Sequence, residues 1–244
     1  MIKVENIEPW GFEHAIRGMR NPLNSWAKSD SGYNCVQNEK ELCDPHCTVD
    51  NYCDTRMSKF IIGKNDLDLM KRLYKAGTEH RKYLRQIFVS MDITAPLYWW
   101  KEFDTYKFVV PDPGHIDVNS CSTMHKIAAK EFELNDFSHE HLISDEDEMF
   151  NDEWFGFTGE TVLLSVISNL NFWRNKYLLH KDKKYWWQLI QLLPSSYNQR
   201  RTVTMNYENV VTIIKQRTGH KLDEWREFVE ILSKLPYIDD ICGE

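Results

Sequence analysis

The segment Ile87–Lys107 constrains the fold most, because it reads as a strand that runs directly into a helix. From Ile87 to Ile93 an apolar side chain recurs at every second position, which is typical of a strand with one apolar face. Pro96 follows at a position that the first turn of a helix tolerates, and the aromatic run after it continues the helix to Lys107. The chain must therefore contain strand and helix in immediate succession.

Helical periodicity dominates the rest of the chain. Pro111, Pro113 and Gly114 predict a loop over 109–120, and polar residues predict another over 21–59. Helices are expected at 11–20, 65–76, 97–107, 122–130, 161–179, 183–193, 207–217 and 222–235, and strands at 2–4, 87–93 and 202–206. The class is helix-rich α+β, taken as a single domain over 1–244 with a Cys-rich polar loop insertion at about 30–58.

The composition is that of a folded globular protein, with 42% hydrophobic residues to supply a core. The formal net charge of −7 argues against non-specific binding of nucleic acid, because neutralising phosphates requires an excess of Lys and Arg. No apolar run reaches the length needed to cross a bilayer, so no membrane partner is expected. The N-terminus carries acids where a signal peptide would begin with positive charge, which predicts a cytoplasmic location.

Four of the six cysteines fall within one polar segment, at Cys35, Cys43, Cys47 and Cys53. Thiols stay reduced in the cytoplasm, so disulfides are not expected. Four soft ligands would suit a tetrahedral zinc ion, which would stabilise a loop that has no core of its own. The spacings lack the paired two-residue pattern of strong zinc motifs, so free thiols are the favoured interpretation and zinc is the alternative.

Several segments, in order, resemble the flavin-dependent thymidylate synthases. "KAGTEH" is similar to a turn of that family, and "FVSMDITAPLYWWKEFDTYK" is similar to its strand, Ala-Pro and helix. "NSCSTMHK" is similar to its serine segment, with Asn119 and Ser122 at the fixed points. The C-terminal block from Leu192 to Trp225 matches the family at Pro194, Asn206, Arg217 and Glu224. The resemblance implies that family's fold, with a small central sheet, and a homotetramer whose sites are built from several subunits.

The chain departs from the family's pattern where the family carries positive charge. The helix end at 105–107 reads Thr-Tyr-Lys in place of Arg-His-Arg, and Met124 stands where an arginine would contact the nucleotide. Thr78 replaces a histidine of the turn. Arg200 and Arg201 are the candidates to compensate for Met124, although a solvated surface is the favoured interpretation of both.

The resemblance assigns roles by position. Arg217 is expected to face the pyrimidine, where a planar guanidinium suits a carbonyl or a phosphate, although an arginine before Gly219 also favours a helix C-terminus. Ser122 is expected at the substrate, and a hydroxyl there can equally cap a helix. The implied catalytic residues are Arg217 and Ser122; the cofactor-binding residues are Thr78, Glu79, Tyr106, Lys107 and Asn206; the substrate-binding residues are Asn119, Ser122, Thr123, Arg200, Arg201 and Arg217.

Trp99 and Trp100 are expected in the core or at a subunit interface, because the corresponding helix of the family presents only its C-terminal end to the site. The function implied is reductive methylation of dUMP, or of a related deoxynucleotide, at C5. Methylenetetrahydrofolate supplies the methylene group, reduced FAD delivers a hydride to it, and NADPH reduces the flavin. The alternative is a diverged, non-catalytic homologue that binds a nucleotide or a protein, a reading favoured by the missing Arg-His-Arg motif.

Overall fold

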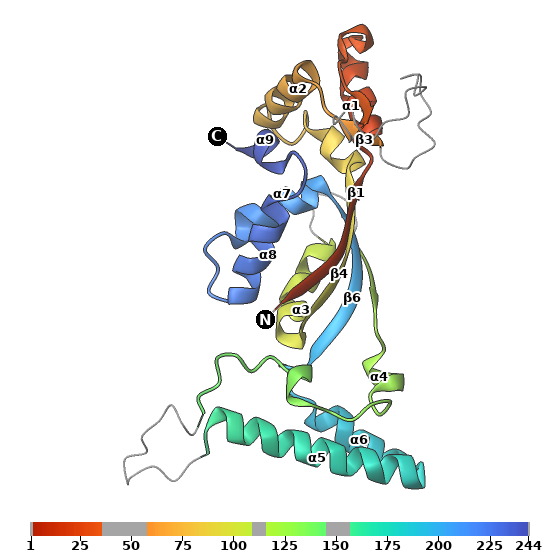
Figure 1. The fold of residues 1–244 in the computed structure, drawn as a ribbon, viewed down its shortest axis with the longest axis vertical. Helices are drawn as coiled ribbons and strands as arrows, with labels where there is room; N and C mark the ends of the chain where they lie inside the picture. Colours follow the sequence, from red (N-terminus) through yellow and green to blue (C-terminus); the bar gives the residue numbers. More distant parts are fainter. Residues whose placement is uncertain (1, 36–57, 109–115, 145–156, 244) are drawn as a thin grey trace, which may run out of the picture.

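The computed structural model describes residues 2–35, 58–108, 116–144 and 157–243. Its centre is an antiparallel four-stranded sheet in the order β1 (Lys3–Trp10), β4 (Phe88–Pro96), β6 (Asn198–Asn206) and β5 (Asp117–Ser120). Helices surround and extend this sheet, which confirms the helix-rich α+β class (Figure 1).

The longest pairing in the sheet joins β4 to β6, from Phe88↔Asn206 to Pro96↔Asn198. The predicted strand over 202–206 is therefore too short. The observed strand begins at Asn198, because each of its residues from 198 to 206 pairs with a residue of β4. Arg200 and Arg201 consequently lie within a strand and point to opposite faces of the sheet.

One face of the sheet is covered by α3 (Leu97–Phe103), α7 (Tyr207–Arg217) and α8 (Asp223–Ser233) (Figure 1). Trp99 and Trp100 are fully buried there, which confirms that they are core residues. The ring of Trp99 lies 4.9 Å from that of Trp100 and 4.7 Å from that of Trp225, measured between centroids. Among the described residues, no helix covers the opposite face of the sheet (Figure 1).

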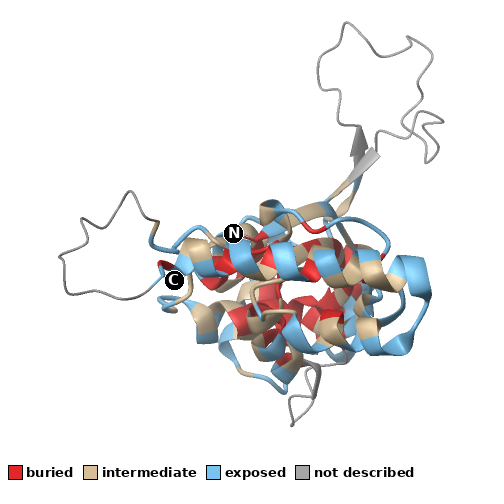
Figure 2. Cartoon of the chain, turned by 90° about the horizontal axis from the view of Figure 1, so that it is seen from below, coloured by how far each residue is buried: buried red, intermediate tan, exposed pale blue. Residues whose placement is uncertain are grey.

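A second hydrophobic cluster lies beyond one end of the sheet, around α5 (Gly159–His180) and α6 (Lys183–Leu192) (Figure 1). Its buried residues on the two helices are Leu163, Ile167, Leu170 and Leu189. Figure 2 views the chain from below, with buried residues gathered in the interior and many exposed residues on the outward faces of the helices.

At the other end of the sheet, α1 (Phe12–Arg20) and α2 (Lys64–Lys75) lie beside a hairpin of β2 (Gly32–Cys35) and β3 (Ser58–Ile61) (Figure 1). The turn from β1 into α1 requires Gly11, whose φ is +93°. A side chain at Gly11 would also lie 2.3 Å from the backbone oxygen of Gln86, so the two segments approach closely.

Several predicted boundaries are wrong. The predicted loop over 109–120 contains β5, because the prolines precede the strand and Val118 pairs with Val203. The predicted loop over 21–59 contains β2 and the start of β3, where Tyr33 meets Phe60, together with short 3-10 turns at Asn21–Leu23 and Trp26–Lys28.

Three helices also differ from their predicted ranges. The helix expected to reach Lys107 ends at Phe103 and tightens into a 3-10 turn over Asp104–Phe108. The one expected over 122–130 is only α4 (Thr123–Lys126), and Ile127 after it is buried in the second cluster. The helix α9 (Ile238–Cys242) was not predicted; two short 3-10 turns, Lys82–Gln86 and Leu134–Asp136, complete the described elements.

None of the helices in the described ranges is both long enough and apolar enough to span a membrane.

Candidate functional site

Arg217, the strongest sequence candidate, lies where the end of α7 meets the end of α3. Its Nε donates a hydrogen bond to the hydroxyl of Tyr106, and its Nη1 donates to a carboxylate oxygen of Glu102. The guanidinium carbon lies 4.6 Å from the ring centroid of Trp225 and 5.2 Å from that of Tyr106. The side chain is 15% exposed, so the guanidinium is held in a nearly closed aromatic and acidic setting.

Glu102 is the hub of this cluster. Its second carboxylate oxygen accepts a hydrogen bond of 2.7 Å from the indole nitrogen of Trp225. The ring nitrogen Nε2 of His220 lies 3.3 Å from the oxygen that also accepts from Arg217. Glu102 therefore joins α3 to both α7 and α8, and the site it forms contains a cation, an anion and two aromatic faces.

Tyr106 is brought next to Arg217, as the sequence placed both at one site. The Tyr106 side chain is buried. Burial raises the pKa of its phenol, while the adjacent Arg217 guanidinium acts in the opposite direction. Tyr106 therefore keeps its proton at neutral pH and serves as a hydrogen-bonding group.

Ser122 directly precedes α4, which lies toward the other end of the sheet from α2 (Figure 1). Its hydroxyl accepts a hydrogen bond of 3.0 Å from the backbone nitrogen of His125, so it is the N-cap of α4. Asn119 is exposed near the end of β5, and Thr123 is half-buried at the start of α4. This segment gathers several small polar groups, as its composition predicted.

The side chain of Arg200 lies on the uncovered face of the sheet. Its backbone is close to this segment, because its backbone oxygen accepts a hydrogen bond from the backbone nitrogen of Cys121. Its Nη2 donates to Asp92 at 2.7 Å. Asp92 also accepts from the hydroxyl of Thr202, at 2.5 Å, and from the side-chain amide of Asn6, at 2.8 Å. These hydrogen bonds, that of Thr202 first, hold the pKa of Asp92 well below its usual range.

Arg201 lies on the covered face. Its guanidinium carbon is 4.2 Å from the ring centroid of Trp100, and its Nη1 donates to Asp104 at 2.9 Å. Burial lowers its pKa, and Asp104 opposes that effect. Arg200 and Arg201 are thus separated by the sheet and do not form one basic patch.

Three of the remaining predicted residues, Asn206, Thr78 and Glu79, lie toward the end of the sheet where β4 begins and β6 ends. Asn206 is buried as the N-cap of α7, and its side chain accepts from the backbone nitrogen of Asn209 at 3.0 Å. Thr78 and Glu79 are exposed in the turn after α2. The backbone of Lys107 belongs to the turn Asp104–Phe108, and its side chain lies outside the described part.

The predicted site residues whose side chains are described therefore occupy four places: the Arg217–Tyr106 cluster, Arg201 beside Trp100 and Asp104, the strands and turn that carry Arg200 and the segment 119–123, and the end near Thr78 and Asn206. Of the proposed zinc ligands, Cys43, Cys47 and Cys53 lie outside the described residues. Within the described residues, no group of His, Cys, Asp and Glu is arranged to hold a metal ion.

The three arginines of the candidate site each face a carboxylate of the same chain: Arg200 faces Asp92, Arg201 faces Asp104 and Arg217 faces Glu102. A flavin or nucleotide phosphate needs cationic donors that it can reach. Arg200 meets this requirement best, because its side chain is 52% exposed. Its guanidinium extends away from the segment 119–123, to Asp92 on β4 and toward Glu5 on β1, so only its backbone lies beside that segment. The small donors of the segment 119–123 fit an oxyanion in their chemistry, whereas Arg201 and Arg217 are enclosed.

Sequence reasoning did not pair these arginines with their carboxylates. Glu102 follows Trp100 by two residues and Asp92 alternates with the apolar positions of β4, and nothing in the sequence links either residue to its arginine. Each arginine is far from its carboxylate in the sequence: the separation is 108 residues for the pair with Asp92, 97 for the pair with Asp104 and 115 for the pair with Glu102. Only the pairing of β4 with β6 and the docking of α3 on α7 bring them together.

Comparison with solved structures gives full-length likenesses. The chain superposes on thymidylate synthase X of Helicobacter pylori, solved with FAD and dUMP, with a TM-score of 0.60 and 15% sequence identity, covering 100% of this chain and 98% of that one. A second structure of the Helicobacter pylori flavin-dependent enzyme, complexed with FAD and dUMP, gives 0.59 and 15%, covering 100% and 97%. No family model matches the sequence, and no curated protein matches it. The likeness establishes a thymidylate synthase X-like fold.

Proposed function

We propose that the protein is a flavin-dependent enzyme of the thymidylate synthase X type, which methylates dUMP or a related deoxynucleotide reductively at C5. The observation that carries the proposal is the end-to-end likeness to structures that hold FAD and dUMP. The resemblance of the serine segment and of the C-terminal block to that family supports it further. FAD, when bound and reduced, would supply the hydride, with methylenetetrahydrofolate as carbon donor and NADPH as reductant.

The residues divide this work by their chemistry. Asn119, Ser122 and Thr123 present small donors that suit a phosphate. Arg200 is an exposed cation on the neighbouring strand, and it would have to leave Asp92 and turn toward these residues to contact the same phosphate. Arg217 and Tyr106 offer a guanidinium and a phenol that suit the carbonyl oxygens of a pyrimidine ring. For Arg217 to serve in this way, the ligand must share it with Glu102 or displace Glu102.

The test is an absorption spectrum of the purified chain before and after incubation with excess FAD and gel filtration. A retained flavin spectrum, together with thermal stabilisation by dUMP, is the expected result. A chain that stays colourless and shows no shift with dUMP would exclude the proposal.

A second function is favoured by one observation, the enclosure of Arg217 by Glu102, Tyr106 and Trp225. In this alternative the arginine is a structural anchor, and the chain is a non-catalytic homologue that binds a nucleotide or a protein. It predicts stabilisation by a deoxynucleotide with no flavin retained and no turnover.

We further propose that the sites are completed between copies of the chain, as a homotetramer would allow. α5 supports this, because it is apolar on two sides. Leu163, Ile167 and Leu170 are buried on one side, while the large side chains on the other are exposed. Leu164, Phe172 and Leu179 recur at intervals of about two turns, which places them on that second side. A helix that is hydrophobic all round is normally buried.

Changing Phe172 and Leu179 together to glutamate is expected to reduce the mass of the protein in solution to that of a smaller assembly. Two carboxylates cannot be buried in an apolar interface without a large desolvation cost. The measurement is light scattering coupled to gel filtration. Asn169→Glu, which adds one carboxylate at an exposed position of the same helix, should leave the mass unchanged. An unchanged mass in the double variant would contradict the proposed interface.

Replacing Ser122 with alanine is expected to weaken dUMP binding at least about tenfold, which corresponds to about 1.4 kcal/mol. Ser122 also caps a four-residue helix, so the substitution should lower the free energy of unfolding by about 1 kcal/mol. Titration of dUMP against each protein and thermal unfolding measure the two effects separately. Ser120→Ala is the control, because that side chain is also exposed and lies two residues away. Equal affinity in Ser122→Ala and the parent would remove Ser122 from the site.

A further inference from the structure

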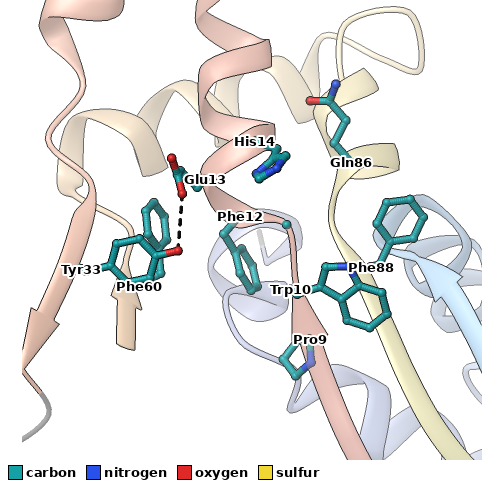
Figure 3. A pocket seen from close by; sticks show the side chains of 10 residues that line it. Pro9, Trp10, Phe12, Glu13, His14, Tyr33, Phe60, Gln86 and Phe88 are labelled. Carbon is teal, nitrogen blue, oxygen red and sulfur yellow. Dashed lines mark hydrogen bonds between the residues drawn. The ribbon is translucent and has the colours of Figure 1, made fainter. Parts of the chain in front are cut away.

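A cavity of about 470 Å³ lies where the end of β1, the start of α1 and the hairpin β2–β3 meet (Figure 3). This volume falls within the range of small-molecule sites. The cavity shares no residue with the candidate site described above. Aromatic rings from separate parts of the chain line it: Trp10, Phe12, Tyr33, Phe60 and Phe88.

The rings form two pairs with Phe12 between them (Figure 3). Trp10 and Phe88 stack with their centroids 5.9 Å apart, and Tyr33 meets Phe60 edge-on at 5.2 Å. Trp10 and Tyr33 are 45% and 64% exposed, so solvent reaches their rings. Exposed aromatic rings are therefore gathered around one cavity. Such a contiguous apolar surface is typical of a binding site, whereas single exposed apolar residues are common on any protein surface.

The floor of the cavity is firmly held. Phe12 is buried and packs edge-on against Tyr207 at 5.7 Å and against Tyr237 at 5.6 Å. The close approach of Gly11 to the backbone of Gln86 fixes where α1 begins. The aromatic rings at the base of the cavity are therefore positioned by the core and need no ligand to arrange them.

Glu13 gives the described lining of the cavity a negative charge. Among the described residues that line it, Glu13 is the one carboxylate, His14 is the one basic side chain, and there is no lysine or arginine. The start of α1 contributes a positive partial charge of about half a unit, which the full charge of Glu13 exceeds. Glu13 accepts from the hydroxyl of Tyr33 across 3.4 Å, a long hydrogen bond that leaves the carboxylate able to face a ligand (Figure 3).

We propose that this cavity binds a small organic cation, an alkylated ammonium group held over aromatic faces beside a carboxylate. Ring faces attract cations through their quadrupole, and Trp provides the strongest attraction. Glu13 adds direct charge complementarity. A phosphate-bearing ligand is disfavoured by the same carboxylate, and none of the lining residues is among the predicted nucleotide- or flavin-binding residues.

The test compares two probes of equal shape, choline and its uncharged isostere 3,3-dimethyl-1-butanol, by ligand-detected NMR titration of the full chain. Choline is expected to bind at least about tenfold more tightly, because only the cation interacts with the ring quadrupoles and with Glu13. Equal affinity of the two probes, or no detectable binding of choline, would overturn the proposal.

Variants locate the site. Trp10→Ala is expected to weaken choline binding about tenfold, whereas Trp26→Ala, at another exposed tryptophan outside the cavity, should bind choline like the parent. Glu13→Gln keeps the size of the side chain and removes its charge, so it tests the proposal even where Trp10→Ala fails to fold. Unchanged choline affinity in Glu13→Gln would overturn the proposed role of the carboxylate, and equal loss in Trp26→Ala would overturn the location.

Discussion

Asp66→Asn is expected to lower the free energy of unfolding by about 3–5 kcal/mol, the cost of leaving one member of a buried ion pair without its partner. Asp66 is fully buried, and its Oδ1 accepts a hydrogen bond of 2.6 Å from Nε of Arg20, which is also buried. Its Oδ2 accepts from both the backbone and the hydroxyl of Ser31, and from the hydroxyl of Ser29. One carboxylate thus ties α1, α2 and the approach to β2 together.

The control for this substitution lies on the same helix. Asp68 pairs with Arg72 at the surface, with both side chains about two-thirds exposed, so Asp68→Asn should cost no more than about 0.5 kcal/mol. Arg20→Gln should cost less than Asp66→Asn, because the Asp66 carboxylate keeps the donors of Ser29 and Ser31. Chemical denaturation of the four proteins measures these differences. A similar small cost for Asp66→Asn and Asp68→Asn would contradict the anchor.

The same carboxylate predicts an acid limit to stability. Burial acts to raise the pKa of Asp66, but hydrogen bonds from Ser31, Ser29 and Arg20 outweigh it and hold the pKa below its ordinary value of 3.8. Because the folded pKa is lowered, this stabilisation is fully present above the unfolded pKa of about 3.9 and is lost as the pH falls through the folded value. Unfolding below pH 4 should therefore be less steep in pH for Asp66→Asn than for the parent.

Arg217→Lys is expected to weaken dUMP binding more than about tenfold, equivalent to about 1.4 kcal/mol, and also to destabilise the fold. A lysine keeps the charge but loses the planar fork, which donates to Tyr106 and Glu102 while lying near the Trp225 ring. Charged hydrogen bonds of this kind contribute about 1.5–3 kcal/mol each. Calorimetric titration and thermal unfolding follow the two effects.

Glu102→Gln separates the two roles of Arg217. It leaves the arginine in place and removes the charge that competes for it, so it should retain or strengthen dUMP binding while lowering stability. Trp225 can still donate to the amide oxygen of a glutamine. Loss of dUMP binding in Glu102→Gln equal to that in Arg217→Lys would show that the cluster acts on the nucleotide only through the fold.

The sequence predicted the elements better than their ends. The alternation over 87–93 and the long periodic runs identified β4, α5 and α7, because such patterns report the environment of each side chain directly. The strands β2, β3 and β5 were missed because each of them is only four residues long. Strands this short carry little periodicity, and their pairing depends on a distant partner.

In the candidate site, too, some residues could be located from the sequence and others could not. The neighbourhood of Arg217 and Tyr106 followed from a resemblance that aligns the ends of two helices. The carboxylates opposite the arginines and the aromatic cavity had no such guide. Asp92 and Glu102 acquire their roles from tertiary pairing, and Trp10 and Tyr33 meet one cavity only because Gly11 and the hairpin bring β1, α1 and β2 together.

The most direct test of the proposed function is an anaerobic single turnover. The FAD-loaded protein is reduced, methylenetetrahydrofolate is added with or without dUMP, and the flavin absorbance and the nucleotide product are followed. The account predicts that the reduced flavin is oxidised only when dUMP is present, with one thymidylate formed for each flavin oxidised. Retained flavin that shows no dUMP-dependent oxidation, with no thymidylate formed, would contradict it and leave a nucleotide-binding homologue.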